Sequence, residues 1–284
     1  MNFFYSNQTG TTLYFKSFNK KNNSYFFLNQ NKFNEFSDLK NCKKILKFRE
    51  MILFIEKFKP KFFFISATKD RIENQIIKNS KKFNYNVISI IDYPTNLKMN
   101  KRFVSKKKKL LPDKIYIPDI YAKKKMIKIG YPNKKLFIIK NPYLNGIKKL
   151  KKKPNKKIKI LLIDQNFPGV NYLNNLKKLK NALIRAYKDC NVNIRQHPEN
   201  LKNKKIKKIF ENEIFEKKCK FLDNYSHIIG HSSTLMNIAL LKGLNVLSFN
   251  PFNKKDFNCP LFERGLINEG KEFEDVINFI NLKK

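Results

Sequence analysis

The sequence gathers its scarce histidines in one window, which holds His197, His227 and His231. His197 is followed by Pro198, and His231 is followed by a Ser-Ser-Thr turn, in the segments "RQHPEN" and "GHSST". Imidazole and hydroxyl groups donate hydrogen bonds to phosphate oxygens, and imidazole also titrates near neutral pH. The residue types therefore indicate binding and release of a phosphorylated ligand.

The second of these segments has the composition of an anion site. Gly230 relaxes the backbone after an apolar run, and His231, Ser232, Ser233 and Thr234 then begin an amphipathic stretch. The first N–H groups of a helix have no partner within the helix, and the helix dipole is positive at that end. With the hydroxyl groups beside them, these N–H groups predict a site for a mono- or diphosphate.

Simpler interpretations remain open for each residue taken alone. A serine or threonine at this position is often only a helix cap. His197 at the end of a strand could bond a backbone carbonyl, with Pro198 fixing the turn, instead of binding a phosphate or a departing nucleotide. For His227, which begins a strand, a structural role is favoured.

Strands and helices alternate through the second half of the chain. Short apolar runs predict buried strands, and apolar residues three and four apart predict helices. The expected strands are 158–164, 191–198, 226–232 and 245–251, and the expected helices are 172–190, 200–218, 233–243 and 272–284, with a strand-like piece at 219–224. Such alternation is typical of a parallel sheet, which binds ligands beyond the carboxyl ends of its strands. Because His197 and His231 each follow a strand, we expect their loops to converge.

The first half predicts the same plan. We expect strands at 61–67, 85–92, 112–119 and 135–142 with helices at 70–84 and 120–130, preceded by strands at 13–18 and 24–29 and a helix at 36–60. The polar, lysine-rich stretch 145–159 is typical of a linker. We therefore predict an α/β protein of two Rossmann-like domains facing a cleft, residues 1–148 and 149–284.

The composition of the chain indicates which classes of partner it can bind. The formal net charge is +39, but the lysines are spread along the whole chain together with many Asn, Ile and Phe residues. General compositional bias explains this better than specific nucleic-acid recognition, although attraction to an anionic membrane face is compatible with it. Four scattered cysteines, no signal peptide and no long apolar run favour a cytoplasmic protein, at most peripheral to the inner membrane.

A catalytic base is harder to choose. Asp164 and Asp92 each end a predicted strand, in "LLID" and "SIID", and are the candidates, although either could be a turn or capping residue. The sequence has no D-x-D, no H-E-x-x-H, no G-x-G-x-x-G after a strand and no P-loop lysine motif. We therefore expect no metal and no cofactor besides the substrate.

The "HP" that ends one strand and the later "HIIGHSSTLMNIALLKGLNVLSF" resemble the nucleotide-binding half of GT-B glycosyltransferases of bacterial surface polysaccharide synthesis. The likeness is to sialyltransferase-like and capsule-polymer enzymes, and to related glycerophosphotransferases. The earlier "GYPNKKLFIIKNP" is similar to the close of the first domain in these enzymes and in UDP-GlcNAc 2-epimerases. The resemblance implies that His197, Pro198 and the Ser232–Thr234 turn bind the donor phosphate.

The sequence departs from that pattern where Asn237 stands in place of the glutamate that often contacts the donor ribose. The leading hypothesis is a metal-independent glycosyltransferase that uses a CMP- or UDP-linked sugar and a saccharide or lipid-linked acceptor. A sugar-nucleotide epimerase, a glycerophosphotransferase and a non-catalytic lysine-rich nucleic-acid-binding protein are the alternatives.

Overall fold

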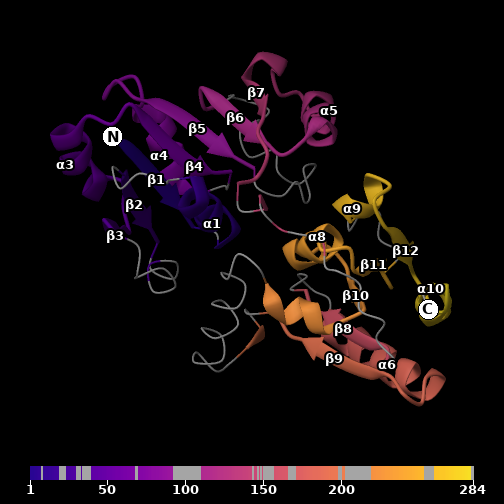
Figure 1. Cartoon of the computed structure of the whole chain (residues 1–284). Coiled ribbons are helices and arrows are strands. Elements are labelled where there is room, and N and C mark those ends of the chain that lie inside the picture. The colour runs from indigo at the N-terminus through magenta and orange to yellow at the C-terminus, as the bar shows by residue number, and fades with distance from the viewer. Residues whose placement is uncertain are drawn as a thin grey trace. The chain divides into compact units, whose positions relative to one another are not determined.

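The chain divides into two compact units, Met1–Asn145 and Gly146–Lys284. The computed structural model describes residues 1–7, 9–18, 24–29, 33, 40–67, 70–91, 110–142, 144–145, 147, 149, 157–165, 171–197, 200–201, 219–252 and 259–282. Each unit is built on its own parallel sheet with helices on both faces (Figure 1). The expected α/β class with two Rossmann-like sheets is thus confirmed.

The sheet of the first unit has the strand order β3-β2-β1-β4-β5-β6-β7, and every pair in it is parallel. Its strands are β1 (Asn2–Ser6), β2 (Ser24–Leu28), β3 (Cys42–Lys44), β4 (Phe62–Ser66), β5 (Asn86–Ile90), β6 (Lys114–Ile117) and β7 (Leu136–Ile138). Its helices are α1 (Thr9–Phe18), α3 (Arg49–Phe58), α4 (Arg71–Asn79) and α5 (Ile120–Lys128), with a 3-10 turn η1 (Asn133–Lys135).

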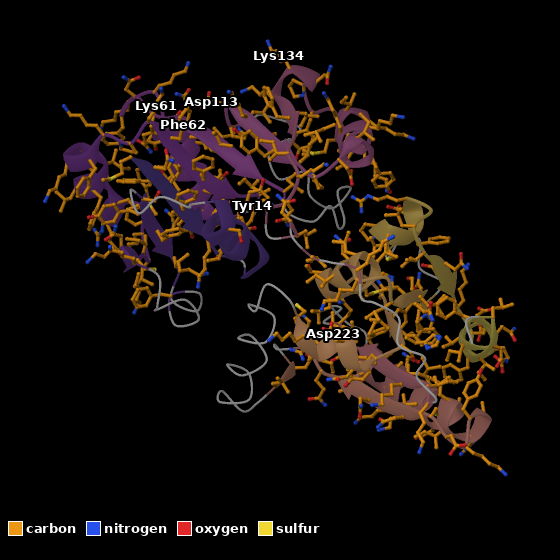
Figure 2. The ribbon with its side chains drawn as sticks, in the orientation of Figure 1. Tyr14, Lys61, Phe62, Asp113, Lys134 and Asp223 are labelled. Carbon is orange, nitrogen blue, oxygen red and sulfur yellow. The ribbon has the colours of Figure 1, made fainter. Side chains whose placement is uncertain are left out.

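Aromatic side chains fill the centre of this unit. On one face the ring of Phe4 stacks on Phe26 at 5.0 Å and on Phe64 at 4.8 Å. Tyr14 and Phe15 of α1 pack in the same cluster, and Tyr14 is labelled in Figure 2. The other face is covered by buried residues of α3, α4 and α5. The sheet is therefore apolar on both sides, as parallel sheets require.

The second unit has the strand order β12-β11-β10-β8-β9, again all parallel. Its strands are β8 (Lys159–Ile163), β9 (Asn191–Arg195), β10 (His227–Gly230), β11 (Asn245–Phe249) and β12 (Asn268–Gly270). Its helices are α6 (Tyr172–Ala186), α8 (Thr234–Leu241), α9 (Pro260–Glu263) and α10 (Phe273–Asn281), with a 3-10 turn η3 (Lys220–Asn224).

Helix α6 shows how the sequence sets this packing. Tyr172, Leu176, Leu179 and Leu183 recur at helical spacing, and all four are buried against the sheet. Asn171 caps the helix by accepting a hydrogen bond from Asn174 N–H at 3.1 Å. Helix α10 covers the same face, whereas α8 packs against β10 and β11.

Three expectations about single elements were wrong. Residues 13–18 belong to α1 instead of a strand, and 219–224 form a 3-10 turn. The helix expected over 36–60 begins only at Arg49, because Cys42–Lys44 pairs with β2 as an edge strand. The helix expected at 200–218 lies largely outside the described residues.

Candidate functional site

The sheet of the second unit reverses its winding beside β8. Strand β9, which follows β8 in the chain, lies on one side of it, and β10 lies on the other side. Open α/β sheets bind ligands at such a reversal, beyond the carboxyl ends of the strands. Here those ends are Ile163 of β8 and Gly230 of β10, so the loops that follow them form the candidate site.

Gly230 is required by close packing between the two strands. A Cβ atom at this position would lie 3.1 Å from Ile163 Cβ, 3.2 Å from Ile163 O and 3.3 Å from Met236 Sδ. These distances are shorter than ordinary van der Waals contact, so a side chain would force the strands or Met236 to move. The glycine therefore lets β10 and α8 approach β8 closely.

The residues after Gly230 begin helix α8. Ser233 is the N-cap, and its Oγ accepts a hydrogen bond from Leu235 N–H at 3.2 Å. His231 is only 1% exposed and its carbonyl accepts a hydrogen bond from Ser248 Oγ at 3.4 Å, whereas Ser232 and Thr234 are partly exposed. Ser233 thus caps the helix, and the hydroxyl groups of Ser232 and Thr234 lie near its positive end, where an anion can be held.

Strand β9 carries His197 to the same edge of the sheet. The side chain of His197 is partly exposed, and its backbone N–H donates to Asp164 Oδ2 at 3.1 Å. The carbonyl of His197 accepts from Asn200 N–H at 2.8 Å, which closes a tight turn. Pro198 lies outside the described residues. The structure therefore places His197 beside the loop of β8, the neighbour of β10.

Asp164, which directly follows β8, joins these loops. It is 1% exposed, and its carboxylate accepts hydrogen bonds from Gln165 N–H at 2.9 Å and from Asn200 Nδ2 at 2.7 Å, besides the one from His197. Gln165 Oε1 in turn accepts from Ser232 Oγ at 3.5 Å. The carboxylate of Asp164 thus joins the loops after β8 and β9, and the side chain of Gln165 contacts the loop after β10.

Two other residues were singled out in the sequence. Asp92 is outside the described residues. Asn237 lies in the second turn of α8 and is partly exposed.

His227 is enclosed at the start of β10. Its Nδ1 lies 2.9 Å from Ser226 Oγ and its Nε2 lies 3.2 Å from Asn245 Nδ2, while Phe279 packs edge-on against the ring. Burial lowers the pKa of His227 to about 4, so the ring is neutral at physiological pH. These contacts agree with the structural role favoured from the sequence.

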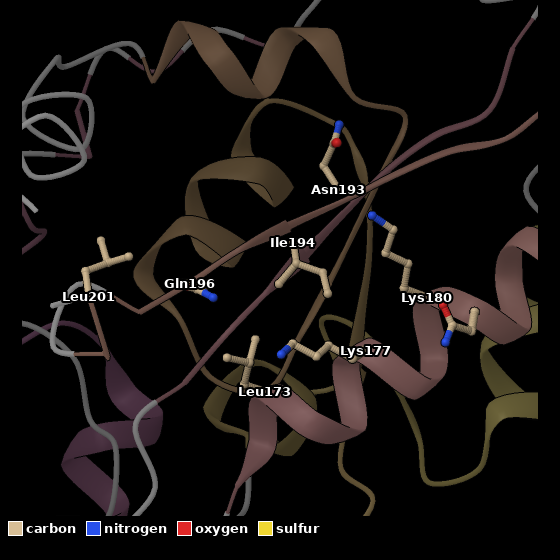
Figure 3. Close-up of a pocket in the computed structure, with 8 residues that line it drawn as sticks. Leu173, Lys177, Lys180, Asn193, Ile194, Gln196 and Leu201 are labelled. Carbon is tan, nitrogen blue, oxygen red and sulfur yellow. The ribbon is translucent and has the colours of Figure 1, made fainter. Parts of the chain in front are cut away.

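A pocket of about 640 Å³ lies next to the turn that carries His197, on its α6 side (Figure 3). It is lined by Leu173, Lys177, Lys180, Asn181, Asn193, Ile194, Gln196 and Leu201. These residues come from α6, β9 and the segment after β9, so the pocket is separate from the reversal between β8 and β10. Its two lysines give it a positive wall, and Gln196 and Leu201 flank the turn.

The first unit has its own reversal, between β1 and β4, and no sequence motif predicts a site there. Asp70 Oδ2 accepts from Tyr5 Oη at 2.5 Å and from Asn7 Nδ2 at 2.8 Å, and Ser66 Oγ donates to the buried Glu73 at 2.6 Å. Burial, followed by the hydrogen bond to Asp70, raises the pKa of Tyr5. The aspartate could be predicted as the cap of the expected helix 70–84, but its contact with Tyr5 could not.

Within the described parts of the chain, no three His, Cys, Asp or Glu side chains are grouped closely enough to hold a metal ion. None of the helices in those parts has the length and hydrophobicity needed to cross a bilayer.

Solved structures resemble this chain over nearly its whole length. A putative UDP-N-acetylglucosamine 2-epimerase from Listeria monocytogenes has a TM-score of 0.65 at 10% identity, covering 99% of this chain and 88% of the epimerase. HepE from Anabaena in complex with UDP-glucose has a TM-score of 0.63 at 10% identity, covering 99% and 89%. This chain has a GT-B-like fold.

The lipopolysaccharide outer core galactosyltransferase WaaB gives a TM-score of 0.56 at 11% identity, covering 99% of this chain and 89% of WaaB. No family model matches the chain, and no curated protein matches its sequence. Identities this low establish the fold and leave the activity to be argued from the site.

Proposed function

We propose that the protein is a metal-independent glycosyltransferase, which moves a sugar from a nucleotide-activated donor to a surface-polysaccharide acceptor. The second unit would bind the donor, and the first unit would bind a saccharide or lipid-linked acceptor. The lysine-rich surface would favour acceptors carried by an anionic membrane. The proposal concerns both the donor class, a CMP- or UDP-linked sugar, and the reaction.

The observation that carries the proposal is the position of the α8 N-terminus at the reversal between β8 and β10. Ser232, Ser233 and Thr234 lie there, and the turn of His197 is joined to the same loops through Asp164. A donor phosphate in this place would meet the helix dipole and several hydrogen-bond donors. The likeness in fold to HepE, whose structure contains UDP-glucose, supports this choice of ligand.

The mechanism follows from where charge develops. When the bond between the sugar and the donor phosphate breaks, negative charge grows on the phosphate oxygens. Groups already directed at those oxygens stabilise the transition state more than the ground state. We propose that the start of α8 supplies this stabilisation and that His197 donates a hydrogen bond to the leaving nucleotide. No metal ion is needed for this step.

The acceptor hydroxyl must also lose a proton. Of the two aspartates considered from the sequence, Asp164 is enclosed by protein donors, whereas Asp92 follows β5 in the sequence and is outside the described residues. We therefore propose Asp92 as the general base. His197 is the alternative within the second unit.

A second candidate function is a sugar-nucleotide 2-epimerase. It is favoured by the likeness to the Listeria protein, which has the highest TM-score of the three structures compared above. Both functions require the same nucleotide site and differ in the product. A transferase releases free nucleotide and extends the acceptor, whereas an epimerase returns a nucleotide sugar with one inverted carbon.

Nucleotide binding tests the shared part of both functions. We would titrate UDP, CMP, CDP, GDP and a random oligonucleotide by calorimetry, with EDTA present, into wild type, Ser233→Ala and His197→Ala. One pyrimidine nucleotide should bind at a single site, and each variant should weaken it by roughly tenfold. Asp119→Ala is the matched control, because it removes a helix cap in the first unit, where Asp119 accepts from Ala122 N–H at 2.8 Å.

Salt-dependent binding of the oligonucleotide alone, unchanged in both variants, would refute the enzyme proposal in favour of nucleic-acid binding. If one nucleotide binds, it identifies the nucleotide part of the donor. Incubation with the corresponding nucleotide sugars, followed by separation of free nucleotide from epimerised sugar nucleotide, distinguishes transfer from epimerisation.

A further inference from the structure

We infer that Asp164 is a positioning residue, which holds the turn of His197 and the start of the α8 loop in place for the nucleotide, and that Asn200 is its partner in this role. The inference rests on the proposed nucleotide site in the second unit. It assigns the buried aspartate a different task from proton transfer, the task that its place at a strand end first indicated.

Both carboxylate oxygens of Asp164 are occupied by protein hydrogen-bond donors. Oδ1 accepts from Gln165 N–H at 2.9 Å, and Oδ2 accepts from His197 N–H at 3.1 Å and from Asn200 Nδ2 at 2.7 Å. Asp164 is also 1% exposed. A general base must come within hydrogen-bond distance of the hydroxyl that it deprotonates. Both oxygens are instead directed at protein donors, and water hardly reaches them.

The two donors to Oδ2 of Asp164 belong to one turn. The His197 N–H and the Asn200 amide stand at the two ends of one turn, which is closed by Asn200 N–H bonding His197 O at 2.8 Å. A single oxygen of Asp164 therefore fixes both ends of the turn. The direction in which His197 leaves the backbone depends on that oxygen.

The hydrogen bonds around Asp164 continue to the loop before α8. Gln165, whose N–H binds the other carboxylate oxygen, accepts from Ser232 Oγ at 3.5 Å. The backbone N–H of Asp164 also donates to Arg195 O at 2.9 Å, which continues the pairing of β8 with β9 past the last strand residue. Asp164 thus holds the loop of His197 directly, and its neighbour Gln165 contacts the loop of Ser232, so both loops that carry the proposed phosphate ligands meet at the end of β8.

Hydrogen bonds to a charged acceptor are among the stronger ones in a protein, and a buried donor that loses its acceptor is destabilised. Removal of the carboxylate charge should therefore loosen the turn at both ends. A loosened turn would bind the nucleotide less well, because part of the binding free energy would be spent in ordering it. The effect would appear in binding, before any chemical step.

The experiment compares Asp164→Asn, Asn200→Ala and the exchanged pair Asp164→Asn with Asn200→Asp. Asn200 is exposed, so we expect Asn200→Ala to fold. If Asp164→Asn does not fold, the comparison of Asn200→Ala with the wild type still tests the inference. Asn193→Ala is the control, since it removes an exposed amide from β9 whose partner is Tyr225 Oη, 3.4 Å away. Calorimetry with UDP, or the pyrimidine nucleotide that binds the wild type, gives the affinity of each folded variant.

We expect Asn200→Ala to weaken nucleotide binding by roughly threefold to tenfold and Asp164→Asn by tenfold or more, with partial recovery in the exchanged pair. Hydrogen–deuterium exchange of the backbone amide of His197 should become at least tenfold faster in both single variants and stay unchanged in Asn193→Ala. In turnover, KM for the donor should rise while kcat changes only a few-fold.

A general base would give the opposite result. Asp164→Asn would then bind the nucleotide like the wild type and lose roughly a hundredfold or more in kcat, with Asn200→Ala nearly normal. A merely structural role would lower the unfolding free energy and leave nucleotide affinity of the folded protein unchanged. Either result would overturn the inference. If the wild type binds no nucleotide, the proposed function fails, whereas unchanged amide exchange at His197 would separately refute the positioning role.

Discussion

His227 should make the stability of the second unit depend on pH in a defined direction. Its pKa is lowered by burial from the ordinary 6.5 to about 4. Above pH 6.5 the ring is neutral in both the folded and the unfolded chain, so the full stability is present. As the pH falls below 6.5, the unfolded chain takes up a proton that the folded chain refuses, and stability is lost until the pH reaches about 4.

The size of this loss follows from the two pKa values. Between pH 7 and pH 5 the single proton removes about 2 kcal/mol from the free energy of unfolding. That is a substantial part of the roughly 5–15 kcal/mol that usually holds a domain together. The cause is physical enclosure, because His227 is 2% exposed and lies between Ser226, Asn245 and Phe279.

Urea denaturation at pH 7 and pH 5 measures the effect, with His227→Gln as the variant that cannot titrate. The variant should lose about 2 kcal/mol less than the wild type over this interval, whatever other groups contribute. His197→Gln is the control for the removal of an imidazole that is not enclosed, since the side chain of His197 is partly exposed. Since the chain has only three histidines, their imidazole NMR signals can also be followed separately.

Either of two results would refute this reasoning. One is an NMR titration of His227 centred near the ordinary value for histidine. The other is a His227→Gln variant whose unfolding free energy falls as steeply as that of the wild type between the two pH values.

Three further substitutions test the packing. Gly230→Ala places a methyl group 3.1 Å from Ile163 Cβ and should lower the free energy of unfolding by about 1–3 kcal/mol in urea; a more stable variant would contradict the close contact. Asp70→Ala removes both the cap of α4 and the acceptor of Tyr5 Oη, so the free energy of unfolding should fall by about 2–3 kcal/mol. An unchanged free energy of unfolding would show that these hydrogen bonds do not stabilise the unit. Lys242→Met removes a pair with a carboxylate that is 38% exposed, so thermal denaturation should show a change of about 1 kcal/mol or less that disappears at high salt.

The sequence was informative where one element carries its own signal. The spacing of leucines predicts α6, and Ser233 caps the helix whose start the Ser-Ser-Thr turn predicts. Prediction from the sequence failed where contacts with a neighbouring strand decide whether a segment becomes a helix or a strand. "LYFKSF" has the aromatic residues of a strand, yet Tyr14 and Phe15 cover a sheet face from α1. Likewise the short strand β3 exists only because β2 offers an edge to it.

Part of the candidate site could likewise be predicted from the sequence. Strand ends placed His197 and the start of α8 at one edge of the sheet, because parallel strands end together. The enclosure of Asp164 could not be predicted, since its partner Asn200 comes from the loop of a different strand. A strand-end aspartate looks the same in sequence whether it faces a ligand or three protein donors. Only the register of β8 with β9 separates the two cases.

The aromatic strands at the centre of the first unit have a consequence for synthesis on the ribosome. Strand β1 lies between β2 and β4, and both partners follow it in the chain. Each of the three strands contains three consecutive aromatic residues, so a shift of one residue still sets aromatic rings against one another. At usual translation rates β1 waits on the order of several seconds for β4 to be made. During that interval a strand whose aromatic residues allow more than one register is exposed, so we expect mispairing to be most frequent before Ser66 has left the ribosome.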